Sequence, residues 1–384
     1  MIAFLKRAFI DPFASPDRFR LYLGTVLGCS AFSGLILYFA FDFLSHGPWV
    51  LAAYFLTKSI FGNIFLMPFL FWLAQRFPER PYFIGLLILQ GIILLPLIVT
   101  PLDQLSMLSL AFLFSLLFSL FSASFWLLYH VLVIHSSSDA NLGNEVSIAN
   151  IGSSIGSMIG YFIGGLIFAF LPGTWFVMLC FAGLLGSSIL LLSAIPLESP
   201  VQTRSGNVFQ SLFHKPWQSV NTMLDGASHF LISFFAPVWL GFIGLSSVAT
   251  GIVSALGIAC KIASSPFTGH WFHTTKMREG KVGATLITAG WAPWAVIQSP
   301  FVLLWSYFFW TTGSHMFAVG LQSRWYTDKT YANMAAREVA LGIGRSLTCI
   351  LALILIHIDI QYFFLMALGL ALSMILVTSK ESKV

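Results

Sequence analysis

Charged side chains are scarce in this chain. Only 9% of its 384 residues are Asp, Glu, Lys or Arg, whereas 58% are hydrophobic. Soluble domains carry about 25% charged residues, because their surface has to face water. The scarcity excludes a soluble fold, and a mean hydropathy of +0.87 excludes intrinsic disorder. The composition therefore predicts an integral membrane protein.

Cysteine is rare, and recognisable catalytic motifs are missing. The four cysteines all lie in apolar stretches, which predicts small buried side chains and neither disulfides nor metal ligands. No phosphate-binding loop is present, which argues against ATP-driven pumping. His270 and His273 lack the partners of a metal site, and no serine has a recognisable base. We expect no metal, cofactor or nucleic-acid partner, and an intramembrane enzyme is an alternative from another class.

Long apolar runs are abundant instead. A helix needs about 20 apolar residues to cross roughly 30 Å of hydrocarbon, and continuous runs of that length favour helices over a β-barrel. The predicted fold is all-α, with twelve transmembrane helices in two six-helix bundles. The predicted spans are 21–41, 49–73, 82–100, 107–133, 146–170, 175–195, 218–243, 247–268, 282–298, 300–321, 339–357 and 361–378.

The basic residues fall in alternate loops. Sixteen of the 19 Lys and Arg residues lie in segments on one side of the predicted spans, and the loops on the other side contain none. Positively charged loops stay in the cytoplasm. We therefore expect a multi-pass protein of the cell inner (cytoplasmic) membrane with both termini cytoplasmic. Arg337 is assigned to one of these loops, 323–338.

One polar segment, 196–217, divides the predicted spans into two sets of six. Its Pro, Ser and Gly content and mixed charge are typical of a linker, and Val208 to Phe213 form an amphipathic stretch suited to the membrane surface. The predicted division is a cytoplasmic segment, a bundle, the linker, a second bundle and a tail. These parts are 1–20, 21–195, 196–217, 218–378 and 379–384.

The loop after the second span carries Arg76 and Arg80, with Gln75 between the span and these bases. The matching loop in the second half carries Gly269 and Arg278. Together with the topology, these loops resemble the major facilitator superfamily of secondary transporters, although Gln75 replaces the family's acid. The resemblance implies alternating access to a site between two bundles, with these four matching residues in the gate loops.

The fifth span contains glycines that recur every four residues. Small residues at this spacing form a smooth ridge that lets two helix backbones approach closely in lipid. The family's proton-antiporting exporters have a similar ridge with a proline, where Tyr161 stands here. We interpret the ridge as a helix-packing surface, and it also suggests export of amphipathic molecules as an alternative. Its residues are Gly152, Gly156, Gly160 and Gly164.

Three basic side chains are predicted inside the membrane. Lys58 lies roughly 14 Å from the outer end of the second span. Lys261 occupies a similar depth in the eighth span, and Arg345 lies in the eleventh. Asp225 is the one acid at such depth, so an anionic solute with a carboxylate or phosphate would supply the missing charge. The alternatives are that Lys58 extends outward to the interface or that Asp225 pairs permanently with one base.

Proton coupling is expected at Asp225, His229 and His315. Asp225 and His229 are four residues apart and share one helical face. A buried carboxyl group and an imidazole can bind and release protons during a transport cycle. The alternative is that these histidines are hydrogen-bonded packing residues. His130, near the inner end of the fourth span, is expected at the interface.

Aromatic residues are plentiful, and most are expected to contact lipid. Trp126 and Tyr129 in the fourth span and Trp310 in the tenth are candidates for stacking on an organic solute. The family resemblance implies this role, because its cavity is lined by the first, fourth, seventh and tenth spans. Asn63 and Gln322, with Asn150, are candidate neutral hydrogen-bonding groups.

The function predicted from the sequence is secondary active transport of a small organic solute, with an anion preferred and protons as the coupling ion. Proton-driven efflux of amphipathic drugs or metabolites is the first alternative, and a non-transporting receptor or assembly factor is the second. We expect a monomer in contact with membrane lipids. Substrate identity and the direction of transport are left open.

Overall fold

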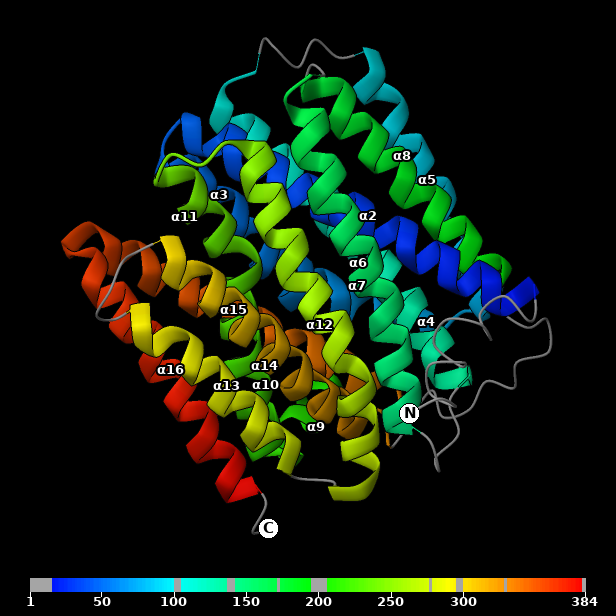
Figure 1. Ribbon diagram of the computed structural model, residues 1–384. Coiled ribbons are helices and arrows are strands. Elements are labelled where there is room, and N and C mark those ends of the chain that lie inside the picture. Colours follow the sequence, from blue (N-terminus) through cyan, green and yellow to red (C-terminus); the bar gives the residue numbers. More distant parts are fainter. Residues whose placement is uncertain are drawn as a thin grey trace.

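The computed structural model describes residues 16–99, 105–136, 142–170, 173–194, 206–275, 278–294, 300–327 and 330–381. Within these ranges the chain is almost entirely helical and contains no strand. The helices lie side by side along a common direction (Figure 1). The predicted all-α membrane fold is therefore confirmed. Much of the predicted linker, including 196–205, lies outside the described residues.

The N-terminal helices agree closely with the predicted spans. The second span is one continuous helical segment made of three parts, α3, η2 and α4, of which η2 has wide π-helical turns. The elements are α2 (Pro16–Ser45), α3 (Pro48–Thr57), η2 (Lys58–Leu66), α4 (Met67–Ala74), α5 (Glu79–Val99), α6 (Met107–Ser136), α7 (Leu142–Phe168) and α8 (Gly173–Ser193).

The C-terminal helices follow a short helix, α9, that coincides with the predicted amphipathic stretch. The seventh span again combines α-helix with π-helical turns. The elements are α9 (Val208–His214), α10 (Pro216–Phe230), η5 (Leu231–Phe235), α11 (Ala236–Phe242), α12 (Ser247–Thr275), α13 (Arg278–Trp294), α14 (Pro300–Tyr326), α15 (Tyr331–Ile358) and α16 (Ile360–Glu381).

Nine helical segments of the described chain are long and apolar enough to cross a membrane. Three further helices, α5, α13 and α14, occupy the predicted spans 82–100, 282–298 and 300–321. All twelve predicted spans therefore coincide with helices.

The eleventh span begins earlier than expected. We predicted a start at 339, but α15 begins at Tyr331, where the Thr330 side chain accepts a hydrogen bond from the backbone N–H of Asn333. This cap satisfies a free backbone donor and fixes the helix start. The assignment of Arg337 to a loop was wrong, because Arg337 and Glu338 both lie in the helix.

Prolines explain the two π-helical segments. η2 ends two residues before Pro68, and η5 ends two residues before Pro237. A proline within a helix removes a backbone donor, and its ring clashes with the carbonyl one turn earlier. The turn before it widens, which rotates the side chains upstream. This local change places Lys58 and Asn63 at the start and middle of a widened segment.

The glycine ridge of α7 faces α2. A side chain built on Gly156 would collide with the backbone carbonyl of Val26, and one on Gly160 would collide with that of Ser30. The hydroxyl of Ser30 donates a hydrogen bond to the carbonyl of Gly156 at 2.9 Å. The ridge thus provides a close backbone contact that no larger residue allows.

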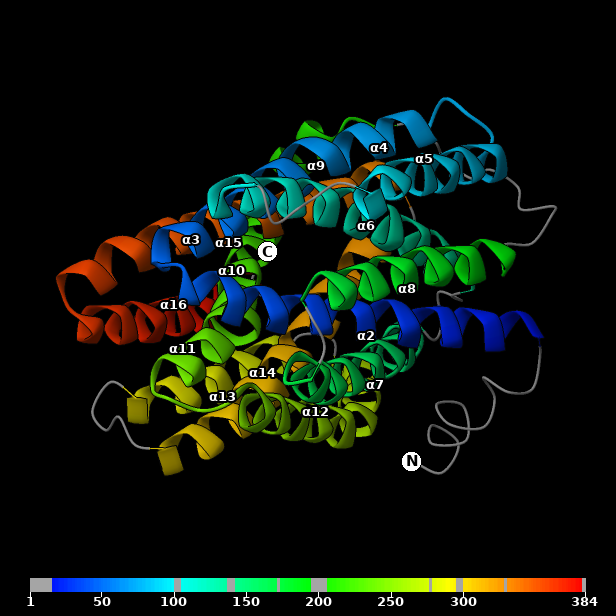
Figure 2. The ribbon, with the colours of Figure 1, turned by 90° about the horizontal axis from the view of Figure 1, so that it is seen from above.

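Two seams join the N-terminal and C-terminal helices. At one seam α7 packs along α12, and at the other η2 and α4 pack along α15. Seen from above, these seams lie on opposite sides of the molecule, with α10 between them (Figure 2). We call the face that carries α9, the first turn of α2 and the last turn of α16 the α9 face (Figure 1).

Candidate functional site

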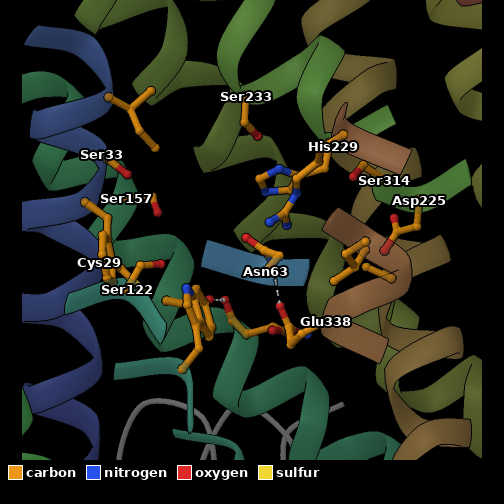
Figure 3. A pocket seen from close by; sticks show the side chains of 18 of the residues that line it. Cys29, Ser33, Asn63, Ser122, Ser157, Asp225, His229, Ser233, Ser314 and Glu338 are labelled. Atoms are coloured by element: carbon orange, nitrogen blue, oxygen red, sulfur yellow. Dashed lines mark hydrogen bonds between the residues drawn. The ribbon is translucent and has the colours of Figure 1, made fainter. Parts of the chain in front are cut away.

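A cavity of about 260 Å³ lies between the N-terminal and C-terminal helices. Its wall is built from α2, η2, α6 and α7 on one side and from α10, α12, α14 and α15 on the other. Figure 3 shows Cys29, Ser33, Ser122 and Ser157 across the cavity from Asp225. Most of the residues that line this wall are polar, and serine is the most frequent among them.

Charged side chains converge on the cavity from four helices. Among the described residues that line it are four bases and two acids, an excess of two positive charges when the histidines are neutral. Three histidines also line it. These nine residues are Lys58, Lys261, Arg337, Arg345, Asp225, Glu338, His130, His229 and His315.

Three of these charged groups have no counter-ion at short range. Within the described part of the chain, Arg345, Lys261 and Asp225 make no ion pair closer than 4.0 Å. The Nε of Arg345 is buried and has no hydrogen-bond partner among the described residues. The alternative that Asp225 pairs permanently with one base is not realised among the described residues. A charge left unpaired in a membrane protein costs several kcal/mol, so this arrangement favours a charged ligand.

Lys58 points inward and does not extend to the outer interface. It is buried, and its ammonium group lies 4.0 Å from the centre of the Phe118 ring. Such a position over an aromatic face stabilises a cation. The Arg345 guanidinium is close enough to interact with it electrostatically across the η2–α15 seam. Close approach at this seam is possible because Gly342 on α15 presents no side chain to Asn63.

Lys261 lies on the opposite wall, on α12, beside His315. The Ser265 hydroxyl donates a hydrogen bond to the carbonyl of Lys261 at 2.8 Å and lies 2.7 Å from Nε2 of His315. The hydroxyl has one proton, so when it donates to this carbonyl, Nε2 of His315 is the donor in the second bond. This bond holds the ring in place and leaves Nδ1 as the position at which it can gain a proton.

A chain of six hydrogen-bonded side chains lies between the cavity and the α9 face, and we call it the polar belt. Asn63 Nδ2 donates to Glu338 Oε2 (3.5 Å), and Glu338 Oε1 is hydrogen-bonded to His130 Nε2 (3.2 Å). His130 Nδ1 is hydrogen-bonded to the Tyr326 hydroxyl, which also accepts from Gln322 Nε2 (2.7 Å). Asn150 Nδ2 donates to Gln322 Oε1 (3.3 Å).

The polar belt crosses repeatedly between the two sets of helices. Asn63, His130 and Asn150 belong to N-terminal helices, and their partners belong to α14 and α15. Figure 3 shows the contact of Asn63 with Glu338. Any separation of the two sets at this level has to break these bonds. The belt therefore joins the two sets of helices on the α9 side of the cavity.

The structure corrects the sequence analysis at this belt. His130 was expected at the interface, but it is 1% exposed and lines the cavity. Glu338 was not identified as an intramembrane acid, and it forms an ion pair with Arg337 as well as contacting His130. The one available signal was the Thr330 cap, which would have extended the eleventh span to include both residues. The excess of two positive charges is unchanged, because one further base and one further acid enter together.

Of the predicted stacking residues, only Trp126 lines the cavity. It stacks on Phe32, with the ring centres 6.4 Å apart and the planes 10° apart. Tyr129 packs against Trp126 but is not among the lining residues. Trp310 is 1% exposed and packs against Trp291 in an aromatic cluster of the C-terminal helices, away from the cavity.

Two of the four residues predicted for the gate loops, Arg76 and Arg80, have described side chains. Arg76 is exposed, and its guanidinium lies 4.0 Å from the centre of the Trp72 ring, while Arg80 is also exposed. The surroundings of Gly269 and the side chain of Arg278 lie outside the part of the chain that the structure describes. A hydrogen bond from the Tyr331 hydroxyl to Glu79 is one contact that joins the two sets of helices beside these loops.

The comparisons with known proteins agree with this architecture. The sequence profile of the Major Facilitator Superfamily matches residues 18–337. No curated protein matches the sequence significantly. Among solved structures, similar folds include the human organic anion transporter MFSD10 (TETRAN), with a TM-score of 0.71, 14% identity, and 95% of this chain and 100% of that one covered.

A bacterial homologue of the iron transporter ferroportin in an outward-facing state is also similar. Its TM-score is 0.73 at 16% identity, with 96% of this chain and 100% of that one covered. The structure of the same homologue with soaked iron has a TM-score of 0.69 at 16% identity, with 95% of this chain and 98% of that one covered. At these identities the likeness shows the fold alone, whereas the profile covers most of the chain. The protein belongs to the Major Facilitator Superfamily, a family of membrane transporters.

Proposed function

We propose that this protein is a secondary transporter of a small organic anion, coupled to protons, in the cell inner membrane. The observation that carries the proposal is the positive excess of the cavity, in which Arg345 and Lys261 make no ion pair among the described residues. The positive-inside distribution makes the α9 face cytoplasmic, with both termini on that side. The organic anion transporter among the similar folds is consistent with this cargo.

The chemistry of the cavity favours an anion over other cargo. A carboxylate or phosphate would receive charge-assisted hydrogen bonds from the Arg345 guanidinium, and Trp126 offers an aromatic face to an organic body. A metal cation would meet a positive excess. Within the described residues, no three His, Cys, Asp or Glu side chains are grouped as a metal site. Iron transport of the kind named for the ferroportin homologue is therefore not favoured here.

Proton coupling is proposed at Asp225, His229 and His315, all of which line the cavity. An anion that enters the cavity approaches the Asp225 carboxylate, which repels it. Protonation of Asp225 removes that repulsion, so binding of the anion and of a proton favour each other. Nδ1 of His315 is a second position that can accept a proton on the same wall.

Alternating access would occur by rocking of the two sets of helices about the α7–α12 and η2–α15 seams. The polar belt would break when the cavity opens toward the α9 face. Direct contacts also join the two sets on the opposite side, where the Tyr161 hydroxyl donates to the carbonyl of Ser233 at 3.0 Å and Phe55 packs on Phe230. The two closures would open in turn.

The test is flux in proteoliposomes that contain the purified protein. Counterflow would be measured with a panel of carboxylates, organic phosphates and organic cations. We expect anions alone to be carried, and Lys58→Gln and Arg345→Gln to lose most of that flux. Lys281→Gln, a base on α13 outside the cavity, is the matched control. Carriage of cations, or unchanged anion flux in both variants, would overturn the proposal.

A further inference from the structure

Cationic groups lie on two separate walls of the cavity. Arg345 and Lys58 meet at the η2–α15 seam. Lys261 belongs to α12, which packs along α7 at the other seam. The two seams lie on opposite sides of the molecule (Figure 2). A single carboxylate bound by Arg345 would therefore leave Lys261 without a counter-ion.

The acids of the protein do not complete this charge balance. Glu338 is already bound to Arg337 and His130 in the polar belt. Asp225, on α10 between the two seams, makes no ion pair closer than 4.0 Å in the described chain. Asp225 faces both Arg345 and Lys261 but pairs with neither, so the lining keeps an excess of two positive charges, which two negative charges would neutralise.

The wall between the cationic positions suits an organic spacer. Trp126 offers a ring face, and hydroxyl groups of Ser122, Ser157 and Ser233 line the same space. Figure 3 shows Ser122 and Ser157 on the side of the cavity opposite Asp225. Such a surface contacts carbon atoms and hydroxyl groups well, and these four side chains carry no charge that would attract a further acidic group.

We infer that the substrate carries two acidic groups at its two ends and bridges the cavity. One group binds Arg345 with Lys58 beside it, and the other binds Lys261. The inference rests on the proposed function and narrows its substrate class to extended dianions. Recognition at both ends then selects for length as well as charge, because a short dianion cannot reach both positions and a long one does not fit.

Binding of α,ω-dicarboxylates to the detergent-purified full chain tests this directly. The series from malonate through suberate would be compared with the monomethyl ester of each acid, using competition against the best-bound member. We expect an affinity maximum at one chain length. At that length the diacid should bind roughly tenfold to a hundredfold more tightly than its ester, which lacks one charge-assisted contact.

A compact dianion tests whether binding depends on the distance between the two negative charges as well as on their number. Phenyl phosphate, measured at mildly alkaline pH, carries both charges on one group. It should bind at least tenfold more weakly than the best dicarboxylate. Equal affinity for phenyl phosphate, equal affinity for the monoesters, or an affinity independent of chain length would each overturn the two-ended site. In those cases anions still bind and the proposed function stands. Binding of no anion at all would instead refute the proposed function.

Substitutions test which residue binds each acidic end of the substrate. Lys261→Gln should abolish the preference for the diacid over its monoester by weakening the diacid to the level of the ester. Lys281→Gln, outside the cavity, should keep the preference. A Lys261→Gln protein that keeps it would place the second acidic group elsewhere and overturn the assignment. The chain-length series on the unchanged protein remains decisive if this variant fails to fold.

Discussion

The Nε2 atom of His130 lies 3.2 Å from Oε1 of Glu338, although 208 residues separate them in the sequence. His130 lies on α6 and Glu338 on α15, so the contact joins the N-terminal helices to the C-terminal helices. Its other neighbours, Tyr326 and Asn63, extend it into the polar belt. A hydrogen-bonded network of this kind, buried at its centre, favours one geometry, which suits a gate that is either closed or open.

Removal of the Tyr326 hydroxyl should weaken the polar belt, because both His130 and Gln322 bond to it. In Tyr326→Phe, the native cavity residue Cys29 should react roughly tenfold faster with a membrane-impermeant maleimide applied to the α9 face. The measurement uses a background in which the other three cysteines are replaced by alanine.

Tyr54→Phe is the matched control for this labelling experiment. The Tyr54 hydroxyl is buried without a hydrogen-bond partner among the described residues, so its loss breaks no bond between the two sets of helices. Labelling of Cys29 that is equally slow in Tyr326→Phe and in the control would show that the belt does not limit access.

Neutralising Glu338 should destabilise the protein by leaving Arg337 buried without its counter-ion. We expect Glu338→Gln to lower the free energy of unfolding by about 3 kcal/mol. In a double-mutant cycle with Arg337→Met, the loss in the double variant should be smaller than the sum of the single losses. Thermal unfolding in one detergent measures all four proteins, and simple additivity would show that the two side chains are not coupled.

Asp225→Asn should separate transport from the proton gradient. The charged groups that face Asp225 are Arg337, Arg345, Glu338 and Lys261. Asn keeps the shape of the side chain but cannot bind a proton, so a pH gradient should no longer drive accumulation of the anion, while exchange of anion across the membrane continues. Proteoliposome uptake with and without an imposed gradient measures both. Gradient-driven uptake that survives in the variant would remove Asp225 from the coupling mechanism.

The contact of α7 with α2 should tolerate no side chain at Gly160. A methyl group there would collide with the backbone carbonyl of Ser30, so Gly160→Ala should cost about 2 kcal/mol and lower the unfolding temperature. Gly91→Ala is the control, because no described atom outside its own helix lies within 4 Å of that position in α5. The control should be neutral or slightly stabilising, since alanine favours helix. Equal unfolding temperatures for both variants would contradict the packing role of the ridge.

The candidate site shows where sequence reasoning succeeds and where it stops. Lys58, Lys261 and Arg345 were identified because a charge in a long apolar run is costly and has to face a cavity or a partner. Trp310 and Tyr129 were assigned to the cavity by their span alone, and the structure places neither in its wall. A helix has several faces, and the face that meets the cavity depends on packing against other helices.

The sequence by itself determined the membrane location, the helical class, the twelve helix positions and the presence of buried positive charge. These follow from local properties, because the length of an apolar run and a charge within it are set by neighbouring residues. Only the tertiary structure decided that Glu338 neutralises Arg337, that His130 belongs to the polar belt, and that Arg345 and Lys261 remain without counter-ions in the described chain. Those pairings join helices far apart in the sequence, and they depend on how the two sets of helices meet.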